Sequence, residues 1–150
     1  MKIVWAILGV VVGYVAIVAI IFLSFSTLYL VIGAEGAYQP GSYQVSMLWI
    51  LASAILGLIA AVIGGFLCKK ISGSRGAVQV FAGIVLVLGL IMGIVQAVSP
   101  APAEEARPAE VSNMEAMQKS QQPLWVAFMN PFLGAIGIII GGGLGGGKEE

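Results

Sequence analysis

The sequence contains no histidine and no aspartate, and its single cysteine is Cys68. A nucleophile paired with a histidine base cannot be built from these residues, and neither can the usual zinc or paired-aspartate metal sites. One cysteine cannot close an intramolecular disulfide bond, so cysteine usage does not reveal the redox compartment. We therefore expect no enzymatic activity, no metal and no cofactor.

Charged residues are also scarce, at 9% of the chain against 59% hydrophobic residues, and the mean hydropathy is +1.03. Soluble domains carry about 25% charged residues. The formal net charge is zero, which offers no basic surface for nucleic acid. This composition predicts an integral membrane protein whose main partner is the lipid bilayer.

Four apolar runs separate three polar loops, and each run reaches or exceeds the ~20 residues that a helix needs to cross a bilayer. The runs cover residues 3–32, 47–68, 77–98 and 124–143. We predict an all-α integral membrane protein, with four transmembrane helices forming a single domain over residues 1–150. The first run is longer than the 7–15 apolar residues typical of a signal peptide, which favours a retained, tilted helix.

The basic residues indicate an orientation. Five of them would lie on one side of the membrane and two on the other, namely Lys2, Lys69, Lys70, Arg75 and Lys148 against Arg107 and Lys119. The side richer in Lys and Arg is normally cytoplasmic, which places both termini in the cytoplasm and the spans in the plasma (inner) membrane. Trp5 would then anchor the inner interface, and Trp49 and Trp125 the outer one.

The second outer loop, residues 100–122, begins with a Pro- and Ala-rich acidic stretch that we expect to be extended. Ser112 and Glu115 then have the spacing of a capping box, and Glu115 and Lys119 have the spacing of a helical ion pair. We predict a short helix here, lying on the membrane surface or on the rim of the bundle. The alternative is a solvated connector with some helix.

An offset of 77 residues aligns "ILGLIAAVIGGFL" in the second run with "FLGAIGIIIGGGL" in the fourth, with seven identities in thirteen positions. This similarity favours two helical hairpins in tandem, arranged as a parallel internal repeat. Convergence of two glycine-rich membrane helices is the alternative, because the first and third runs align poorly.

The final "GGGLGGGKEE" resembles part of a phosphate-binding loop. However, Glu149 occupies the position where such a loop needs Ser or Thr to hold magnesium. We predict no nucleotide binding and interpret residues 144–150 as a flexible, glycine-rich cytoplasmic tail.

Small residues recur four apart in every predicted span, a spacing that lets helix backbones approach closely in lipid. The predicted helix-packing residues are Gly9, Gly13, Ser53, Gly57, Ala61, Gly65, Gly89, Gly93, Ala97, Gly134, Gly137 and Gly141.

Functional side chains inside a membrane are usually polar or charged, and no Glu, Lys or Arg lies within a predicted span. Neutral polar residues remain in the outward third of the spans, namely Ser24, Ser26, Thr27, Ser53, Gln96 and Asn130. The candidates for a vestibule are Ser53, Gln96 and Asn130, with Pro131 after Asn130. They would either bond helix to helix around a kink or line a polar vestibule. We therefore expect a non-catalytic structural or interaction subunit of a membrane assembly, partnered by a second copy or another membrane protein. The alternative is an uncoupled small-solute channel or facilitator.

Overall fold

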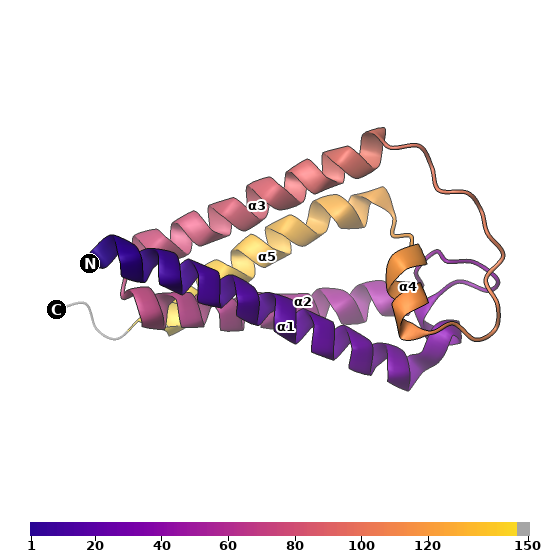
Figure 1. Cartoon of the computed structure of the whole chain (residues 1–150), viewed down its shortest axis with the longest axis horizontal. Helices are drawn as coiled ribbons and strands as arrows, with labels where there is room; N and C mark the ends of the chain where they lie inside the picture. Colours follow the sequence, from indigo (N-terminus) through magenta and orange to yellow (C-terminus); the bar gives the residue numbers. More distant parts are fainter. Residues whose placement is uncertain (147–150) are drawn as a thin grey trace.

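The computed structural model describes residues 1–146, and it consists of α-helices joined by loops (Figure 1). The helices are α1 (Lys2–Ala37), α2 (Met47–Ser72), α3 (Arg75–Val98), α4 (Asn113–Lys119) and α5 (Leu124–Leu144). Extended pairing within residues 1–146 is limited to two isolated bridges. The all-α prediction is confirmed: α1, α2, α3 and α5 are long and apolar enough to cross a membrane.

α1 is the longest helix and contains one break. Its 36 residues correspond to a length on the order of 50 Å, well above the thickness of a bilayer core. At Gly33 the backbone has φ 65° and ψ −177°, a conformation that glycine adopts at little cost because it has no Cβ. The helix resumes after this residue and ends at Ala37, beyond the predicted end at residue 32.

A tight turn joins α2 to α3, and its sequence determines both helix ends. Gly73 ends α2 with φ 64°, the left-handed conformation in which many helices terminate. The hydroxyl of Ser74 then accepts a hydrogen bond from the amide of Ala77 at 3.3 Å and caps α3. With only two residues between them, α2 and α3 lead away from the turn toward the same end of the molecule (Figure 1).

The long helices pack as two pairs, α1 with α2 and α3 with α5, and the pairs meet along α2 and α5. Figure 1 shows the pairs close together near the chain termini and spreading apart toward the loops. We call these two ends of the bundle the turn end and the loop end. Each end has its own buried cluster. Phe81, Cys68 and Ile138 are the largest fully buried side chains and belong to the turn-end cluster.

α2 and α5 run in the same direction and touch through glycines. A Cβ atom added to Gly65 would overlap the carbonyl group of Ile138, and one added to Gly141 would overlap the carbonyl of Val62. Two backbones therefore meet here without a side chain between them, as expected of small residues in apolar helices.

These two contacts are related by an offset of 76 residues, which takes Gly65 to Gly141 and Val62 to Ile138. The predicted offset of 77 instead matches Gly65 with Gly142, which lies against Val78 of α3. One residue corresponds to a rotation of about 100° around a helix. The sequence alignment therefore pairs residues that face different neighbours, and only the helix contact shows which glycines meet a carbonyl of the opposite helix.

Glycines also line the contact between α1 and α2. A Cβ on Gly9 would lie 2.8 Å from the carbonyl oxygen of Cys68, and one on Gly13 would lie 2.7 Å from the carbonyl oxygen of Gly64. Ordinary Cβ contacts are longer, so any side chain here would force the two helices apart.

In the contact between α3 and α5, the glycines of α3 lie against larger side chains. Gly89 accommodates the ring of Pro131, and a Cβ on Gly93 would lie 3.2 Å from the ring of Phe128. Gly134 has a single close neighbour, a valine side chain of α3. α5 remains helical through Pro131, and the proline ring lies in the space that Gly89 leaves.

Gly57 is the one predicted packing glycine of α2 that is not at a close helix contact. A Cβ on Gly57 would meet nothing within 4 Å, Ala97 is exposed, and Ser53 donates a hydrogen bond to a carbonyl of its own helix. A stripe of residues four apart rotates by about 40° at each step. Gly57 therefore points in a different direction from Gly65. Ala97 lies near the loop end of α3, where the two helix pairs have separated.

The predicted flexible tail, residues 144–150, lies partly outside the described residues. Leu144 is the last residue of α5, and Gly145 is buried, with a Cβ position 3.0 Å from the Cβ atom of Lys69. The described beginning of this segment is therefore packed against α2.

Adding one methyl group tests the α2–α5 contact. We expect Gly65→Ala and Gly141→Ala each to lower the free energy of unfolding by about 1–3 kcal/mol, because the methyl group overlaps a carbonyl that cannot move aside. Gly57→Ala is the matched control: it should be neutral or stabilise by up to about 1 kcal/mol, since alanine favours helix and space is open. Thermal melting in detergent measures all three, and a Gly57→Ala loss as large as the others contradicts the assignment.

Candidate functional site

An ordered cap covers the loop end of the bundle (Figure 1). The cap consists of residues 33–46 and residues 99–123, which include α4. Its two segments are joined by backbone hydrogen bonds: the amide of Val45 donates to the carbonyl of Gln121 at 3.0 Å, and the amide of Gln121 donates to the carbonyl of Tyr43 at 2.9 Å. Two loops that are distant in sequence therefore form one unit.

Arg107 is the most buried charged side chain of the cap, with 1% of the side chain exposed. Its Nε donates to the carbonyl of Ser42 at 2.9 Å, and its two terminal nitrogens donate to the carbonyl of Pro108 at 3.1 Å and to Glu35 Oε1 at 3.0 Å. The guanidinium also lies over the ring of Tyr38, 5.5 Å from the ring centre.

A buried guanidinium is stable only if its charge and its N–H groups are matched. Glu35 supplies the opposite charge while remaining 72% exposed, so only one of the two ions is removed from water. The planar fork of Arg107 donates to three acceptors in fixed directions from three separate nitrogens, whereas a lysine has all its donors on a single nitrogen. Its backbone amide also donates to the carbonyl of Gly41 at 3.0 Å. Arg107 thereby fastens the end of α1 and both loops at a single point.

Three tyrosine hydroxyls add further connections between the two segments of the cap and α1. The hydroxyls of Tyr29, Tyr38 and Tyr43 donate to the carbonyl of Val111 at 2.6 Å, the carbonyl of Ala116 at 2.8 Å and the carboxylate of Glu115 at 2.9 Å, respectively. All three rings are buried, which is the usual situation of a tyrosine whose hydroxyl has found a partner.

The tyrosine rings continue a chain of aromatic contacts that starts between the helices. Edge-to-face contacts, with ring centres 5.7 to 6.5 Å apart, link Phe25, Trp49, Tyr29, Tyr38 and Tyr43. Such pairs contribute about 0.5–1.5 kcal/mol each beyond the area they bury. The chain connects α1 and α2 to the cap, so the cap is held in a fixed position on the bundle.

Burial and hydrogen bonding shift the ionisation of this cluster. Burial raises the pKa of Tyr38. Burial also raises the pKa of Tyr43, and the hydrogen bond to Glu115 raises it further. The pKa of Lys119 is raised by its hydrogen bond to Glu105. The cap is therefore most strongly bonded with its tyrosines neutral and its lysine charged.

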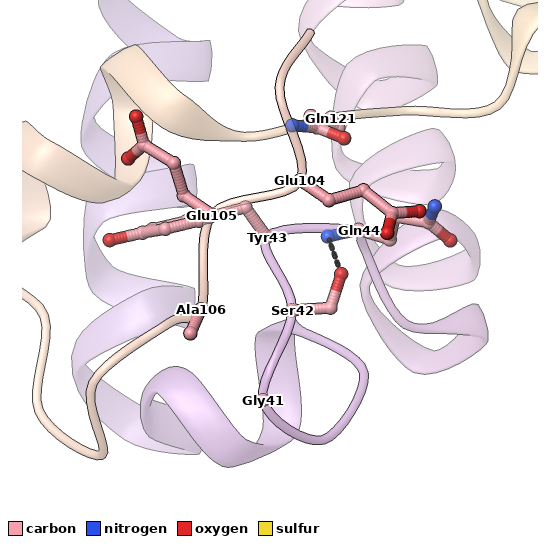
Figure 2. Close-up of a pocket in the computed structure, with 8 residues that line it drawn as sticks. All are labelled: Gly41, Ser42, Tyr43, Gln44, Glu104, Glu105, Ala106 and Gln121. Atoms are coloured by element: carbon pink, nitrogen blue, oxygen red, sulfur yellow. Dashed lines mark hydrogen bonds between the residues drawn. The ribbon is translucent and has the colours of Figure 1, made fainter.

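Figure 2 shows an open hollow beside Tyr43, of about 320 Å³. Residues 41–44 and 104–106 run side by side along it, with the side chains of Glu104 and Gln44 turned the same way. Its lining comprises Gly41, Ser42, Tyr43, Gln44, Glu104, Glu105, Ala106 and Gln121. These groups can make polar contacts but include no nucleophile with a base. No group of three metal-ligating side chains occurs within residues 1–146.

No hydrogen bond joins any two of the residues predicted to line a vestibule, in the described part of the chain. The hydroxyl of Ser53 bonds within α2, Gln96 donates to the carbonyl of Gln122 at 3.1 Å, and Pro131 is buried. Asn130 is exposed on α5.

The three predicted anchors lie at the two ends of the bundle. Trp5 is near the start of α1 at the turn end, whereas Trp49 and Trp125 are near the starts of α2 and α5 at the loop end. Trp5 and Trp125 are each 51% exposed, while Trp49 is partly buried in the aromatic chain.

Sequence reasoning missed the residues that build the cap, above all Arg107, Glu35 and the three tyrosines. Two signals in the sequence could have indicated them. Tyr29, Tyr38 and Tyr43 account for three of the four tyrosines in the chain, and Arg107 is one of only two basic residues on its predicted side. The contacts between residues 33–46 and residues 99–123, however, depend on the distance between α2 and α5, which the sequence does not reveal.

Removing the buried guanidinium tests the cap. We expect Arg107→Ala to lower the free energy of opening the cap by about 3 kcal/mol, because two carbonyls and one carboxylate lose their donor. The readout is hydrogen exchange of amides in residues 104–121, compared with those of α2. Lys119→Ala is the matched control, since its exposed ion pairs contribute about 0.2–1 kcal/mol; equal effects of the two substitutions would refute the central role of Arg107.

The raised pKa values of Tyr38 and Tyr43 predict how the cap responds to alkali. A tyrosine whose folded-state pKa lies above its unfolded value of about 10 contributes stability that is present below pH 10 and is lost as the pH rises through the folded pKa. We expect tyrosinate absorbance to develop at higher pH in the folded protein than after denaturation. The part of the absorbance that appears only at this higher pH should be smaller in Tyr38→Phe and in Tyr43→Phe. Identical titration of folded and denatured protein would exclude this.

Comparison of the chain with family models, with curated proteins and with solved structures found no match in any of the three. Its function therefore has to be argued from the geometry described above.

Proposed function

We propose that the protein is an integral membrane protein in which α1, α2, α3 and α5 cross the plasma (inner) membrane, with the cap outside and both termini in the cytoplasm. One observation supports the orientation and a second supports the insertion. The turn between α2 and α3 is flanked by Lys69, Lys70 and Arg75, and basic residues favour the cytoplasmic side. Large apolar side chains are exposed along all four helices, a surface suited to lipid and not to water.

The two helix pairs are proposed to be tandem hairpins derived from one repeated unit. The support is the symmetry of the central contact: Gly65 against Ile138 and Gly141 against Val62 exchange under an offset of 76 residues. α2 and α5 also run in the same direction, as the second helices of two parallel hairpins would.

The protein acts, in this proposal, as a non-catalytic structural or interaction subunit of a membrane assembly. The observation that carries the proposal is the cap, in which a buried arginine and three tyrosine hydroxyls hold two loops in one arrangement. These polar groups satisfy one another within the protein, so they shape a surface instead of performing chemistry. A rigid surface fixed on membrane helices suits the binding of another protein, because little conformational entropy is lost on association.

Cross-linking from outside the cell tests both the orientation and the role. A membrane-impermeant thiol cross-linker is applied to intact cells that carry either Ala103→Cys in the cap or Gly76→Cys at the start of α3; both positions are exposed, whereas native Cys68 is buried. We expect Ala103→Cys to give one reproducible protein adduct and Gly76→Cys to give none. The adduct should weaken when Arg107→Ala is added, because the cap surface is then no longer held.

Two results would overturn the proposal at different points. Labelling of Gly76→Cys but not of Ala103→Cys would reverse the orientation. Labelling of Ala103→Cys without any adduct, together with fluxes of small neutral solutes or ions through liposomes containing the purified protein, would instead favour a channel or facilitator. In that case replacing Gln96 and Asn130 by leucine should reduce the flux.

A further inference from the structure

α4 lies across the long helices at the loop end, as Figure 1 shows. One side of this seven-residue helix is fixed to the cap: Ala116 is buried, and its carbonyl accepts the hydrogen bond from Tyr38. At its start the hydroxyl of Ser112 accepts from the amide of Glu115 at 3.3 Å, which confirms the predicted N-terminal cap. The helix therefore has a defined rotation about its own axis.

The two flanks of α4 on either side of Ala116 differ in chemistry. Successive residues are turned by about 100°, so Glu115 and Lys119 lie on one flank and Met114 and Met117 on the other. Lys119 pairs with Glu115 at 3.4 Å and with Glu105 at 2.9 Å, which keeps the first flank among polar groups. Met114 and Met117 are 63% and 53% exposed.

Asn113 shows where the methionine flank is directed. It lies on the same side of α4 as Met117, and its amide nitrogen donates to the hydroxyl of Ser26 in α1 at 3.0 Å. Ser26 follows Phe25, whose ring contacts Trp49 near the start of α2 with ring centres 5.7 Å apart. This bond places the side of α4 that carries Asn113 and Met117 at the level of Trp49, where the proposed span begins.

Other apolar side chains are exposed at this same level, among them Leu48, Leu124 and Trp125. Methionine is unbranched and adaptable, which suits contact with a disordered apolar surface. A helix that lies across the spans, with charges on one flank and apolar side chains on the other, has the arrangement of helices that lie in the bilayer interface.

We propose that the flank of α4 formed by Met114 and Met117 is seated in the outer leaflet of the bilayer, at the boundary between head groups and acyl chains. Its occupant is membrane lipid. This inference rests on the proposed membrane insertion and adds a lipid contact made by the cap itself. The cap is then held down by lipid on one flank of α4 while Glu115 and Lys119 remain in water on the other.

Fluorescence quenching tests this placement with three single substitutions, Met117→Cys, Lys119→Cys and Ile136→Cys, each labelled with an environment-sensitive thiol probe. The full-length protein is reconstituted in vesicles of phosphatidylcholine and phosphatidylglycerol, with and without nitroxide-labelled lipid. Unsubstituted protein, in which Cys68 is buried, provides the labelling blank. Ile136 is exposed on α5 and reports on insertion of the spans.

We expect shallow nitroxide lipid to quench the probe at residue 117 at least twofold more than the probe at residue 119, and aqueous iodide to show the reverse order. The probe at residue 136 should be quenched by deep nitroxide lipid. If residue 117 behaves like residue 119, or is shielded from both quenchers by a protein neighbour, the lipid contact is refuted. If residue 136 also escapes lipid quenching, the proposed membrane insertion itself fails.

Discussion

The direct contact between the backbones of α2 and α5 is the constraint on which the rest of the bundle depends. Gly65 and Gly141 each lie against a carbonyl of the opposite helix, so the distance between the two helices has a single value. α1 and α3 then pack on the outer sides of this central pair. The ring of Phe81 fills the space that remains between them at the turn end, where it is fully buried.

The same contact explains why a cap is needed. The helices lie close together at the turn end and diverge toward the loop end (Figure 1), where the buried cluster is completed by cap residues, among them Tyr38, Tyr43 and Val45. Cohesion there comes from aromatic contacts and from hydrogen bonds made by buried polar groups, which are strong only when every donor is satisfied. Among the described residues, no buried side-chain nitrogen or oxygen lacks a hydrogen-bond partner. Close packing of glycine and satisfaction of polar groups thus stabilise opposite ends of one molecule.

Much of the fold could be predicted from the sequence, because apolar run length and the spacing of Ser112 and Glu115 are local signals. The cap could not be predicted, since the bonds of Arg107 join positions more than sixty residues apart. The contact between α2 and α5 could not be predicted for a related reason. In runs of glycine the identity of a residue does not reveal which neighbour it faces, and only the overlap with a specific carbonyl distinguishes Gly141 from Gly142.

The break at Gly33 separates the long rod of α1 from a last turn that belongs to the cap. Glu35, in that last turn, is bonded to Arg107, so the far side of the break is fixed. Before the break, the hydroxyl of Tyr29 donates to the carbonyl of Val111, so α1 contacts the second loop on both sides of Gly33. The change of backbone direction at one glycine thus lets a single helix bind the same loop at two points.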